Sequence, residues 1–346
     1  MAVLLSRSNA PAAAAALSCI ATYGTNTHSS SPCFRPSVKL ASFISSSSLI
    51  NNKNNVIFKP FPSSEQHRRT CSRRFRRDLH VQASAAASSG STEDVRDFVL
   101  THFSRACAFK VISGLQNFNA NNVADIVLAA YKGGATHVDI ACDPELVRMA
   151  VHLTPLPVCV SSVEPESFLA AVEAGAHMIE IGNYDSFYKS GRLFSASEIL
   201  ELTKKTRRYL PNIVLSVTVP HTLSLDEQVK LAEVLEAEGA DIIQTEGGSG
   251  STPLMPGVHG LIEKATPTLA AAYLISKAVK VPVMCASGLS VVTASMAIAA
   301  GASGVGVGSA VNKLNDQIAM VAAVRSIADA LGLLSRSSRS LSPIAL

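Results

Sequence analysis

From residue 93 onward, short runs of β-branched apolar residues alternate with amphipathic segments, and this alternation limits the fold more than any other feature. Eight runs have the length and composition of strands: 109–115, 137–142, 157–163, 178–183, 213–219, 241–246, 282–287 and 304–308. Helical periodicity is found at 92–106, 119–132, 144–153, 165–174, 196–210, 225–238, 267–279, 291–300 and 313–331. Strands that alternate with helices form a parallel sheet covered on both faces.

A small repeat favours closure of this sheet into a barrel. The segments 173–176, 238–241 and 300–303 each pair a glycine with small residues and lead from a helix into a strand. Eight equivalent units of this kind predict a single (β/α)8 TIM barrel over residues 92–332. A doubly wound open parallel sheet stays open as the alternative, because the number of strands does not prove closure.

The composition changes near residue 90, which divides the chain. Residues 1–92 hold eleven Lys or Arg, two acids and nineteen Ser, a net charge of +9, whereas the rest carries −5. A Ser- and Arg-rich, acid-poor segment without periodicity predicts a disordered transit peptide at 1–83 and a linker at 84–91. The predicted address is the chloroplast stroma, with a mitochondrial address as the alternative. The Ser-rich segment 333–346 is predicted to be a disordered tail.

Charge, hydropathy and cysteine spacing narrow the partners. The basic residues belong to the predicted transit peptide, so no nucleic-acid partner is predicted for the folded part. The most apolar stretch, 291–311, is interrupted by four glycines, which argues against a membrane span and a membrane partner. The seven cysteines form no CxxC or Cys/His pair with metal spacing, so we predict no metal site and no disulfide framework. A homo-oligomer stays open.

In a barrel of this kind the carboxyl ends of the strands form the ligand face. His221 directly follows the fifth strand and His259 is placed in the loop after the sixth, so these two histidines are candidates for function. A stretch of about twenty residues between the sixth strand and the next helix has the length of a lid or binding loop. We predict a lid at Gly247, Gly248, Ser249 and Gly250, with a plain surface insertion as the alternative.

Glycines gather at the ends of the last two strands. The seventh strand ends in Cys-Ala-Ser-Gly at 285–288, and the eighth reads Gly-Val-Gly-Val-Gly-Ser at 304–309. Accessible backbone amides after strands seven and eight form a phosphate cradle in many barrels. The predicted phosphate ligands are Ser287, Gly288, Gly306, Gly308 and Ser309. The alternative is that the glycines only permit close packing.

The period of two along each strand predicts which polar side chains enter the barrel. These are Lys110, Asp139, Ser161, Glu180, Ser216, Thr218, Gln244, Glu246 and Ser287. Buried charges are costly unless they are paired, so Lys110 is expected to form an ion pair with Asp139 or Glu180. The alternative, which the sequence supports equally well, is that Lys110 acts as a base, a Schiff-base amine or an anion ligand while the carboxylates move protons.

Several motifs of the sequence occur together in one known family. They are Phe-Lys-Val-Ile-Ser-Gly-Leu-Gln-Asn-Phe at 109–118, His-Val-Asp-Ile-Ala at 137–141, Gln-Thr-Glu-Gly-Gly at 244–248 and Met-Cys-Ala-Ser-Gly-Leu-Ser at 284–290. Through them, residues 93–332 resemble the plastid and cyanobacterial family called hypothetical chloroplast open reading frame twenty-three. The resemblance implies a plastid location and a TIM barrel of the aldolase type. It supplies no catalytic residues, because the function of that family is unknown.

These observations lead to three hypotheses about function. The first is an enzyme that isomerises, epimerises or cleaves a small phosphorylated metabolite, with catalytic groups among Lys110, Asp139, Glu180, His221 and Glu246. No cofactor is predicted for it. The second is an oxidoreductase that holds flavin mononucleotide (FMN) by its phosphate in the same cradle. The third is a barrel without catalytic activity that senses a metabolite or serves as a scaffold.

Overall fold

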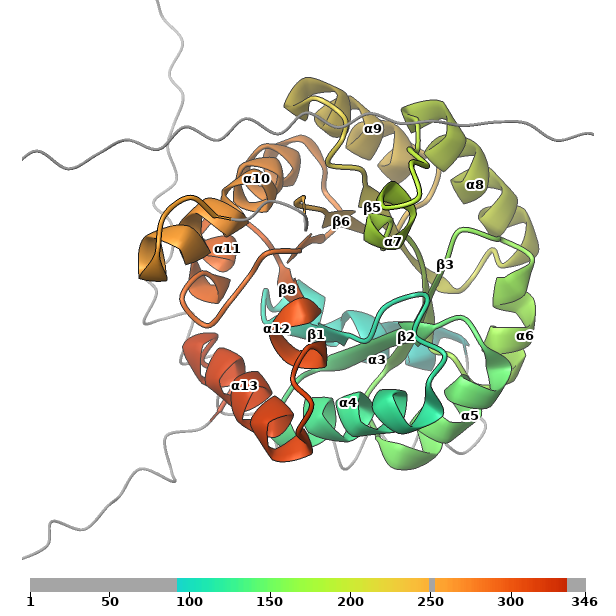
Figure 1. Cartoon of the computed structure of the whole chain (residues 1–346). Coiled ribbons are helices and arrows are strands. Elements are labelled where there is room, and N and C mark those ends of the chain that lie inside the picture. The colour runs from blue at the N-terminus through green and yellow to red at the C-terminus, as the bar shows by residue number, and fades with distance from the viewer. Residues whose placement is uncertain (1–91, 249–252, 335–346) are drawn as a thin grey trace, which may run out of the picture. The chain divides into compact units, whose positions relative to one another are not determined.

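The computed structural model describes residues 92–248 and 253–334, which form a closed barrel of eight parallel strands (Figure 1). The strands are β1 (Ala108–Ile112), β2 (His137–Ala141), β3 (Val158–Ser162), β4 (Met178–Ile181), β5 (Val214–Val219), β6 (Ile242–Thr245), β7 (Val283–Ala286) and β8 (Gly304–Val307). They follow one another around the barrel in chain order, and β8 pairs with β1. The predicted barrel is therefore confirmed, and the open sheet is wrong.

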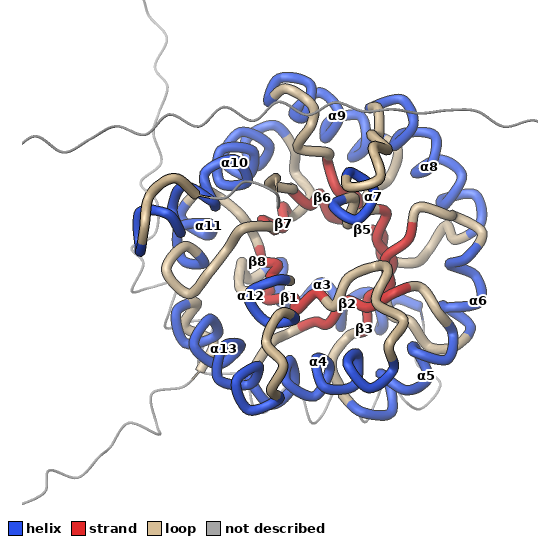
Figure 2. Tube along the Cα trace, viewed as in Figure 1, coloured by secondary structure: helices blue, strands red, loops and turns tan. Residues whose placement is uncertain are grey.

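Most of the helices form an outer ring around the strands (Figure 2). The helices are α3 (Thr92–Ser104), α4 (Ala120–Gly133), α5 (Pro144–Leu153), α6 (Ser167–Glu173), α7 (Asp185–Tyr188), α8 (Ala196–Tyr209), α9 (Leu225–Ala237), α10 (Gly257–Ala278), α11 (Ala294–Ala299), α12 (Ser309–Asn312) and α13 (Gln317–Ala330). The predicted transit peptide, the linker and residues 335–346 of the predicted tail lie outside the described residues. Leu333 of that tail is fully buried in the core, so the packed domain extends past residue 332.

Capping residues explain where several helices begin and end. The Asp143 carboxylate accepts hydrogen bonds from two backbone amides of the first turn of α5, and Pro144 occupies the first helical position. Ser224 and Glu227 form a reciprocal capping box at the start of α9. Gly134 adopts a left-handed conformation after α4. These caps lie where sequence analysis placed the ends of the helices.

One helix boundary was predicted wrongly. The Thr-Pro pair at 266–267 predicted a helix start, but α10 begins ten residues earlier at Gly257 and holds Pro267 in its interior. The Glu263 carboxylate accepts hydrogen bonds from the backbone amides of Leu254 and Met255, which ties the chain before α10 to its second turn. A helix can retain an interior proline when such tertiary contacts offset the lost backbone bond. His259, predicted in a loop, therefore lies on α10, where it is exposed.

Two short helices lie inside the outer ring, at the mouth of the barrel (Figure 1). One is α7, which follows β4, and the other is α12, which follows β8. Sequence analysis predicted neither, because four residues are too few to show helical periodicity. Both lie on the carboxyl side of the strands, where barrels bind ligands.

The apolar core has two parts. The larger one lies between the strands and the helices and includes Phe109, Val138 and Val305. The smaller one fills the amino end of the barrel with Ala108, Cys159, Met178, Val214, Ile242 and Met284, against which Val99 and Phe103 of α3 pack. Helix α3 therefore closes the end of the barrel opposite to the mouth. Among the described residues, no helix is long and apolar enough to cross a membrane.

Candidate active site

A polar layer lies directly above the apolar floor of the barrel. The strand register alternates residues inward and outward, so that Lys110 follows Ala108 and Glu180 follows Met178 on the inner face. The predicted inward polar residues are all buried except Ser287. Ser287 is not part of strand β7; its backbone has a φ of +75°, and its hydroxyl donates to the carbonyl of Gly247 at 2.6 Å. Ser287 thus connects two loops instead of lining the interior.

Lys110 and Glu180 form an ion pair inside the barrel. The Lys110 side chain is only 1% exposed, and its ammonium donates to Oε2 of Glu180. Oε1 of Glu180 accepts from Nε2 of Gln244 at 2.6 Å and from the hydroxyl of Thr218 at 3.3 Å. Burial is the largest single influence and lowers the pKa of Lys110, but the charge and hydrogen bond of Glu180, together with the neighbouring Cys159 and Asp139, outweigh it, and the net result is a raised pKa. Lys110 is therefore an ammonium at neutral pH and not a free amine.

Asp139 lies near this pair and has a different character. Oδ1 accepts from the Ser161 hydroxyl at 2.5 Å, and Oδ2 accepts from the Asn183 amide at 3.0 Å. Complete burial raises the pKa of Asp139 to about 7, although the Lys110 charge acts in the opposite direction. A carboxyl group with a pKa near neutrality can both take up and release a proton at physiological pH.

Asn183 covers Asp139 from the side of the mouth. It is half-buried at the end of β4, and its amide also donates to the Ser161 hydroxyl at 2.8 Å. Its backbone φ is +62°, a conformation that is uncommon for residues other than glycine. Backbone strain of this kind persists where the surroundings hold a residue in place, often at functional sites.

A second polar cluster lies closer to the mouth, around Glu246. The Glu246 carboxylate is 5% exposed, and its Oε2 accepts from the Tyr188 hydroxyl at 2.7 Å and lies 3.0 Å from Nδ1 of His221. His221 is 25% exposed and follows β5, and its ring meets that of Tyr188 edge to face. The hydrogen bond with Glu246 raises the pKa of His221. Asp185, the first residue of α7, completes this cluster.

The ends of β7 and β8 lie side by side, as the predicted phosphate cradle requires. Ala286 pairs with Gly306, and Gly288 and Gly308 each follow that pair by two residues, on the carboxyl side of their strands. Gly288 has a φ of +71°, and Gly308 precedes the first turn of α12, which begins with the exposed Ser309. A loop after strand seven beside a short helix after strand eight is a frequent phosphate site in barrels.

Two of the predicted cradle glycines also have packing roles. A methyl group at Gly306 would lie 2.9 Å from Cβ of Ala286, within the barrel wall. At Gly288 it would lie 2.5 Å from the carbonyl oxygen of Lys264. Gly306 is therefore explained by close packing, the alternative that sequence analysis left open, whereas at Gly308 a methyl group would meet only ordinary contacts.

The predicted lid is only partly described. Gly247 is buried beside Ser287, and Gly248 lies against His221, where a methyl group would be 3.2 Å from Nε2. Ser249 and Gly250 lie outside the described residues. Because α10 begins at Gly257, the predicted stretch of twenty residues shortens to a connection of eleven, from Glu246 to Pro256.

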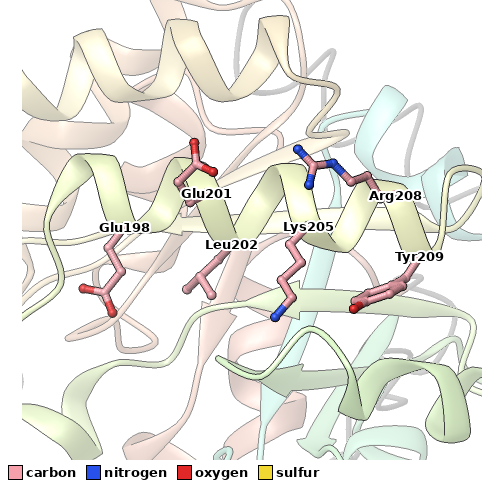
Figure 3. A pocket seen from close by; sticks show the side chains of 6 residues that line it. All are labelled: Glu198, Glu201, Leu202, Lys205, Arg208 and Tyr209. Carbon is pink, nitrogen blue, oxygen red and sulfur yellow. The ribbon is translucent and has the colours of Figure 1, made fainter.

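Two surface hollows lie away from these clusters. One, of about 340 Å³, lies along α8 and is lined by Glu198, Glu201, Leu202, Lys205, Arg208 and Tyr209 (Figure 3). The other, of about 370 Å³, lies beside α3 at the amino ends of β4 and β5. Neither is on the carboxyl side of the strands, so the chemistry is assigned to the buried polar clusters.

Three residues of the clusters were missed by sequence analysis: Asn183, Asp185 and Tyr188. All three follow β4 within a few residues, and α7 turns Asp185 and Tyr188 toward β5 and β6. The available signal was their position just after a strand that carries a buried Glu180. The prediction of no metal site rested on local spacing of cysteines and histidines, and such spacing says nothing about side chains that come together from three separate strand ends.

The family of the chain follows from comparison with known proteins. The family described as "Protein of unknown function (DUF561)" matches residues 95–336, and the chain belongs to it. The "Uncharacterized protein ycf23" of Cyanophora paradoxa is 47% identical over 214 residues, which are 61% of this chain and 87% of the relative. That of Porphyra purpurea is 40% identical over 223 residues, 64% of this chain and 84% of the relative. Both relatives come from plastid genomes.

Solved barrels are similar at much lower identity. The (S)-3-O-geranylgeranylglyceryl phosphate synthase of Thermoplasma acidophilum has 13% identity and a TM-score of 0.48, over 69% of this chain and 98% of that one. The thiamine phosphate pyrophosphorylase of Pyrococcus furiosus has 19% identity and a TM-score of 0.44, over 65% of this chain and 96% of that one.

Proposed function

We propose that this member of the DUF561 family is an enzyme that binds a small phosphorylated metabolite at the mouth of its barrel and moves a proton next to a carbonyl group. The observation that carries the proposal is that the Ser287–Gly288 turn and the short helix α12 directly follow β7 and β8, two strands that pair side by side. Backbone amides at such a place bind phosphate through hydrogen bonds and the helix dipole. The phosphate ligands would be Gly288, Gly308 and Ser309, with Ser287 joining them if it releases Gly247.

The buried charges supply the chemistry. Isomerisation, epimerisation and aldol-type cleavage of a sugar phosphate share one difficult species, a carbanion or enediolate next to a carbonyl. Asp139, with a pKa near neutrality, suits the proton transfer that forms this species. The Lys110 ammonium lies near enough to influence the charge of Asp139 and suits stabilisation of the negative charge that develops. Since Glu180 is occupied by three donors, it serves to hold Lys110.

Access to Asp139 requires a change at Asn183. Asp139 is fully buried, and the Asn183 amide bonds to it from the side of the mouth. A substrate oxygen or hydroxyl that replaces this amide would bring the carbon to be deprotonated within reach of Oδ2.

The proposal is tested by solvent isotope exchange, which needs no knowledge of the final product. The full chain is incubated in D₂O with a panel of small sugar phosphates and their dephosphorylated counterparts, and proton loss at carbon is followed by NMR. We expect exchange with a phosphorylated compound but not with its counterpart. Asp139→Asn should slow the exchange by about 10²-fold or more. Asp226→Asn, a matched change of an exposed acid on α9, should leave it unchanged.

The phosphate site is tested in the same assay by charge. Ser309→Asp adds a negative charge at the exposed start of α12 and should raise KM at least tenfold, with little change in kcat. Ser197→Asp makes the same exchange at an exposed position near the start of α8, which follows β4 on the opposite side of the barrel from β8, and should have no effect. The proposal is overturned if Asp139→Asn keeps full exchange. It is also overturned if the panel shows no exchange and inorganic phosphate does not bind.

We further infer that the chain works in the plastid stroma. Its family match begins at residue 95, after the Ser-rich segment that carries the positive charge of the chain. That composition is typical of an imported transit peptide, and the relatives come from plastid genomes. A fluorescent fusion to residues 1–91 should enter plastids, and a fusion that stays in the cytosol or enters mitochondria would contradict this inference.

A further inference from the structure

We propose that Asp185, His221 and Glu246 form a binding site for one divalent transition-metal ion at the barrel mouth. One ligand atom from each of the three side chains lies within 4.8 Å of the other two. The residues come from the carboxyl ends of three successive strands, β4, β5 and β6. The site is inferred from its own donor atoms and does not depend on a phosphorylated substrate.

The distances in this cluster suit a metal ion. Bonds of about 2.1 Å to nitrogen and oxygen place neighbouring ligand atoms about 3.0–3.4 Å apart in octahedral or tetrahedral geometry. Nδ1 of His221 and Oε2 of Glu246 are 3.0 Å apart, which matches one such edge. The ligand oxygen of Asp185 lies within 4.8 Å of the other two ligand atoms. A modest rotation of its side chain would bring this oxygen close enough for all three atoms to bind the same ion. An ion held on one face keeps its other positions open for water or substrate.

Burial and charge support the same assignment. Two carboxylates held this close repel each other, and a divalent cation offsets that repulsion. Glu246 is almost completely buried, whereas Asp185 and His221 are half-buried, so an ion could enter from the mouth. The Tyr188 hydroxyl donates to Glu246 and fixes the orientation of that carboxylate, as residues around metal ligands commonly do.

The donor set selects the class of ion. One imidazole nitrogen with two carboxylates suits Mn²⁺, Fe²⁺ or Zn²⁺, whereas Ca²⁺ and Mg²⁺ prefer oxygen ligands alone. Mn²⁺ is the better probe here, because residues 1–91 contain three histidines and three cysteines that could bind Zn²⁺. Thiolates have little preference for Mn²⁺.

The test is a titration of the full chain with Mn²⁺ after removal of metals with a chelator. Free Mn²⁺ is followed by its electron paramagnetic resonance signal, and binding is checked by the rise in melting temperature. We expect one ion per chain, with Mg²⁺ at least tenfold weaker. His221→Gln and Asp185→Asn should each weaken Mn²⁺ binding at least tenfold and remove the rise in melting temperature.

Two matched variants serve as controls. His259→Gln changes an exposed histidine on α10, and Asp226→Asn changes an exposed acid on α9; both should bind Mn²⁺ as the unchanged chain does. The proposal is overturned if the chain shows no saturable Mn²⁺ binding. It is equally overturned if His221→Gln and Asp185→Asn, folded by circular dichroism, bind Mn²⁺ unchanged. In that case protonated His221 is the counter-charge of the two carboxylates. If isotope exchange is lost in Asp139→Asn but kept in His221→Gln and Asp185→Asn, the proposed function holds and does not depend on a metal ion.

Discussion

The burial of Lys110 restricts the chemistry that the barrel can perform. Its ammonium is enclosed with the Glu180 carboxylate and has a raised pKa, so it does not provide the neutral amine that Schiff-base formation requires. Of the two roles that sequence analysis left open for Lys110, the ion pair is present, and Glu180 rather than Asp139 is the partner. This leaves Asp139 as the carboxyl group that is free to change its protonation state.

The ion pair predicts a large, one-sided effect on stability. Lys110→Met leaves Glu180 buried without its counter-charge, and we expect the free energy of unfolding to fall by about 3–5 kcal/mol. The double variant Lys110→Met with Glu180→Gln removes both charges and should recover more than half of this loss. Lys230→Met, at an exposed ion pair on α9, should cost less than about 1 kcal/mol. Chemical denaturation of the unchanged chain and of these three variants gives the four free energies of unfolding.

An equal loss in the single and double variants would show that the cost comes from packing and not from the unpaired charge. In that case the hydrogen bonds from Gln244 and Thr218, which the glutamine amide would also disturb, carry the stability of this layer.

At the scale of elements, the sequence predicts the strands well. Along each strand, residues point alternately into the barrel and toward the surrounding helices, and both sides are buried. The bounds of all eight differ from the prediction by a few residues at most. The same alternation predicts that Lys110, Asp139, Glu180 and Glu246 face the interior. It cannot predict which of them pair, because that depends on the stagger of strands around a closed barrel. It also misses α7 and the start of α10, where tertiary contacts outweigh local signals.

The packing of α4 against α13 depends on a glycine. A methyl group at Gly133 would lie 2.5 Å from Cβ of Val324, which is too close for any side chain. Although alanine favours helices over glycine, we expect Gly133→Ala to lower the free energy of unfolding by about 1–3 kcal/mol.

The clash can be separated from other causes by a double-mutant cycle. Adding Val324→Gly removes both Cβ and Cγ1 of Val324, the two side-chain atoms that the new methyl group would meet at 2.5 Å. Gly133→Ala together with Val324→Gly should therefore cost clearly less than the sum of the single changes in urea denaturation. Additive costs would mean that the two helices move apart without strain.

At the scale of the whole molecule, three buried groups set opposing dependences of stability on pH. Burial lowers the pKa of His137 to about 3 and that of His177 to about 4, so both stay neutral in the folded barrel. Below the ordinary histidine pKa of 6.5, these two histidines bind protons in the unfolded chain but not in the folded chain. Stability therefore falls as the pH falls. Asp139 acts oppositely: the folded chain holds a proton that the unfolded chain has lost, so stability falls as pH rises toward about 7.

We therefore expect a stability maximum near neutral pH that shifts in opposite directions in two variants. His177→Gln should lessen the gain in stability between about pH 5 and about pH 6.5, whereas Asp139→Asn should make the gain toward pH 7 steeper, because it removes the opposing effect. Urea denaturation from about pH 5 to about pH 8 measures both slopes. Identical slopes in Asp139→Asn and the unchanged chain would show that Asp139 has an ordinary pKa.

Closure of the barrel between β1 and β8 has a consequence for how the molecule is made. The Asn312 side chain donates to the carbonyl groups of Ile112 and Ser113, 200 residues earlier in the chain. Until β8 has been synthesised and has paired, β1 and β7 each keep an open edge of unpaired amide and carbonyl groups. Such open edges recruit other chains. Loop closure over such a separation is slow. We therefore expect the molecule to be most prone to aggregation before β8 has paired with β1, a risk that comes from topology and not from composition.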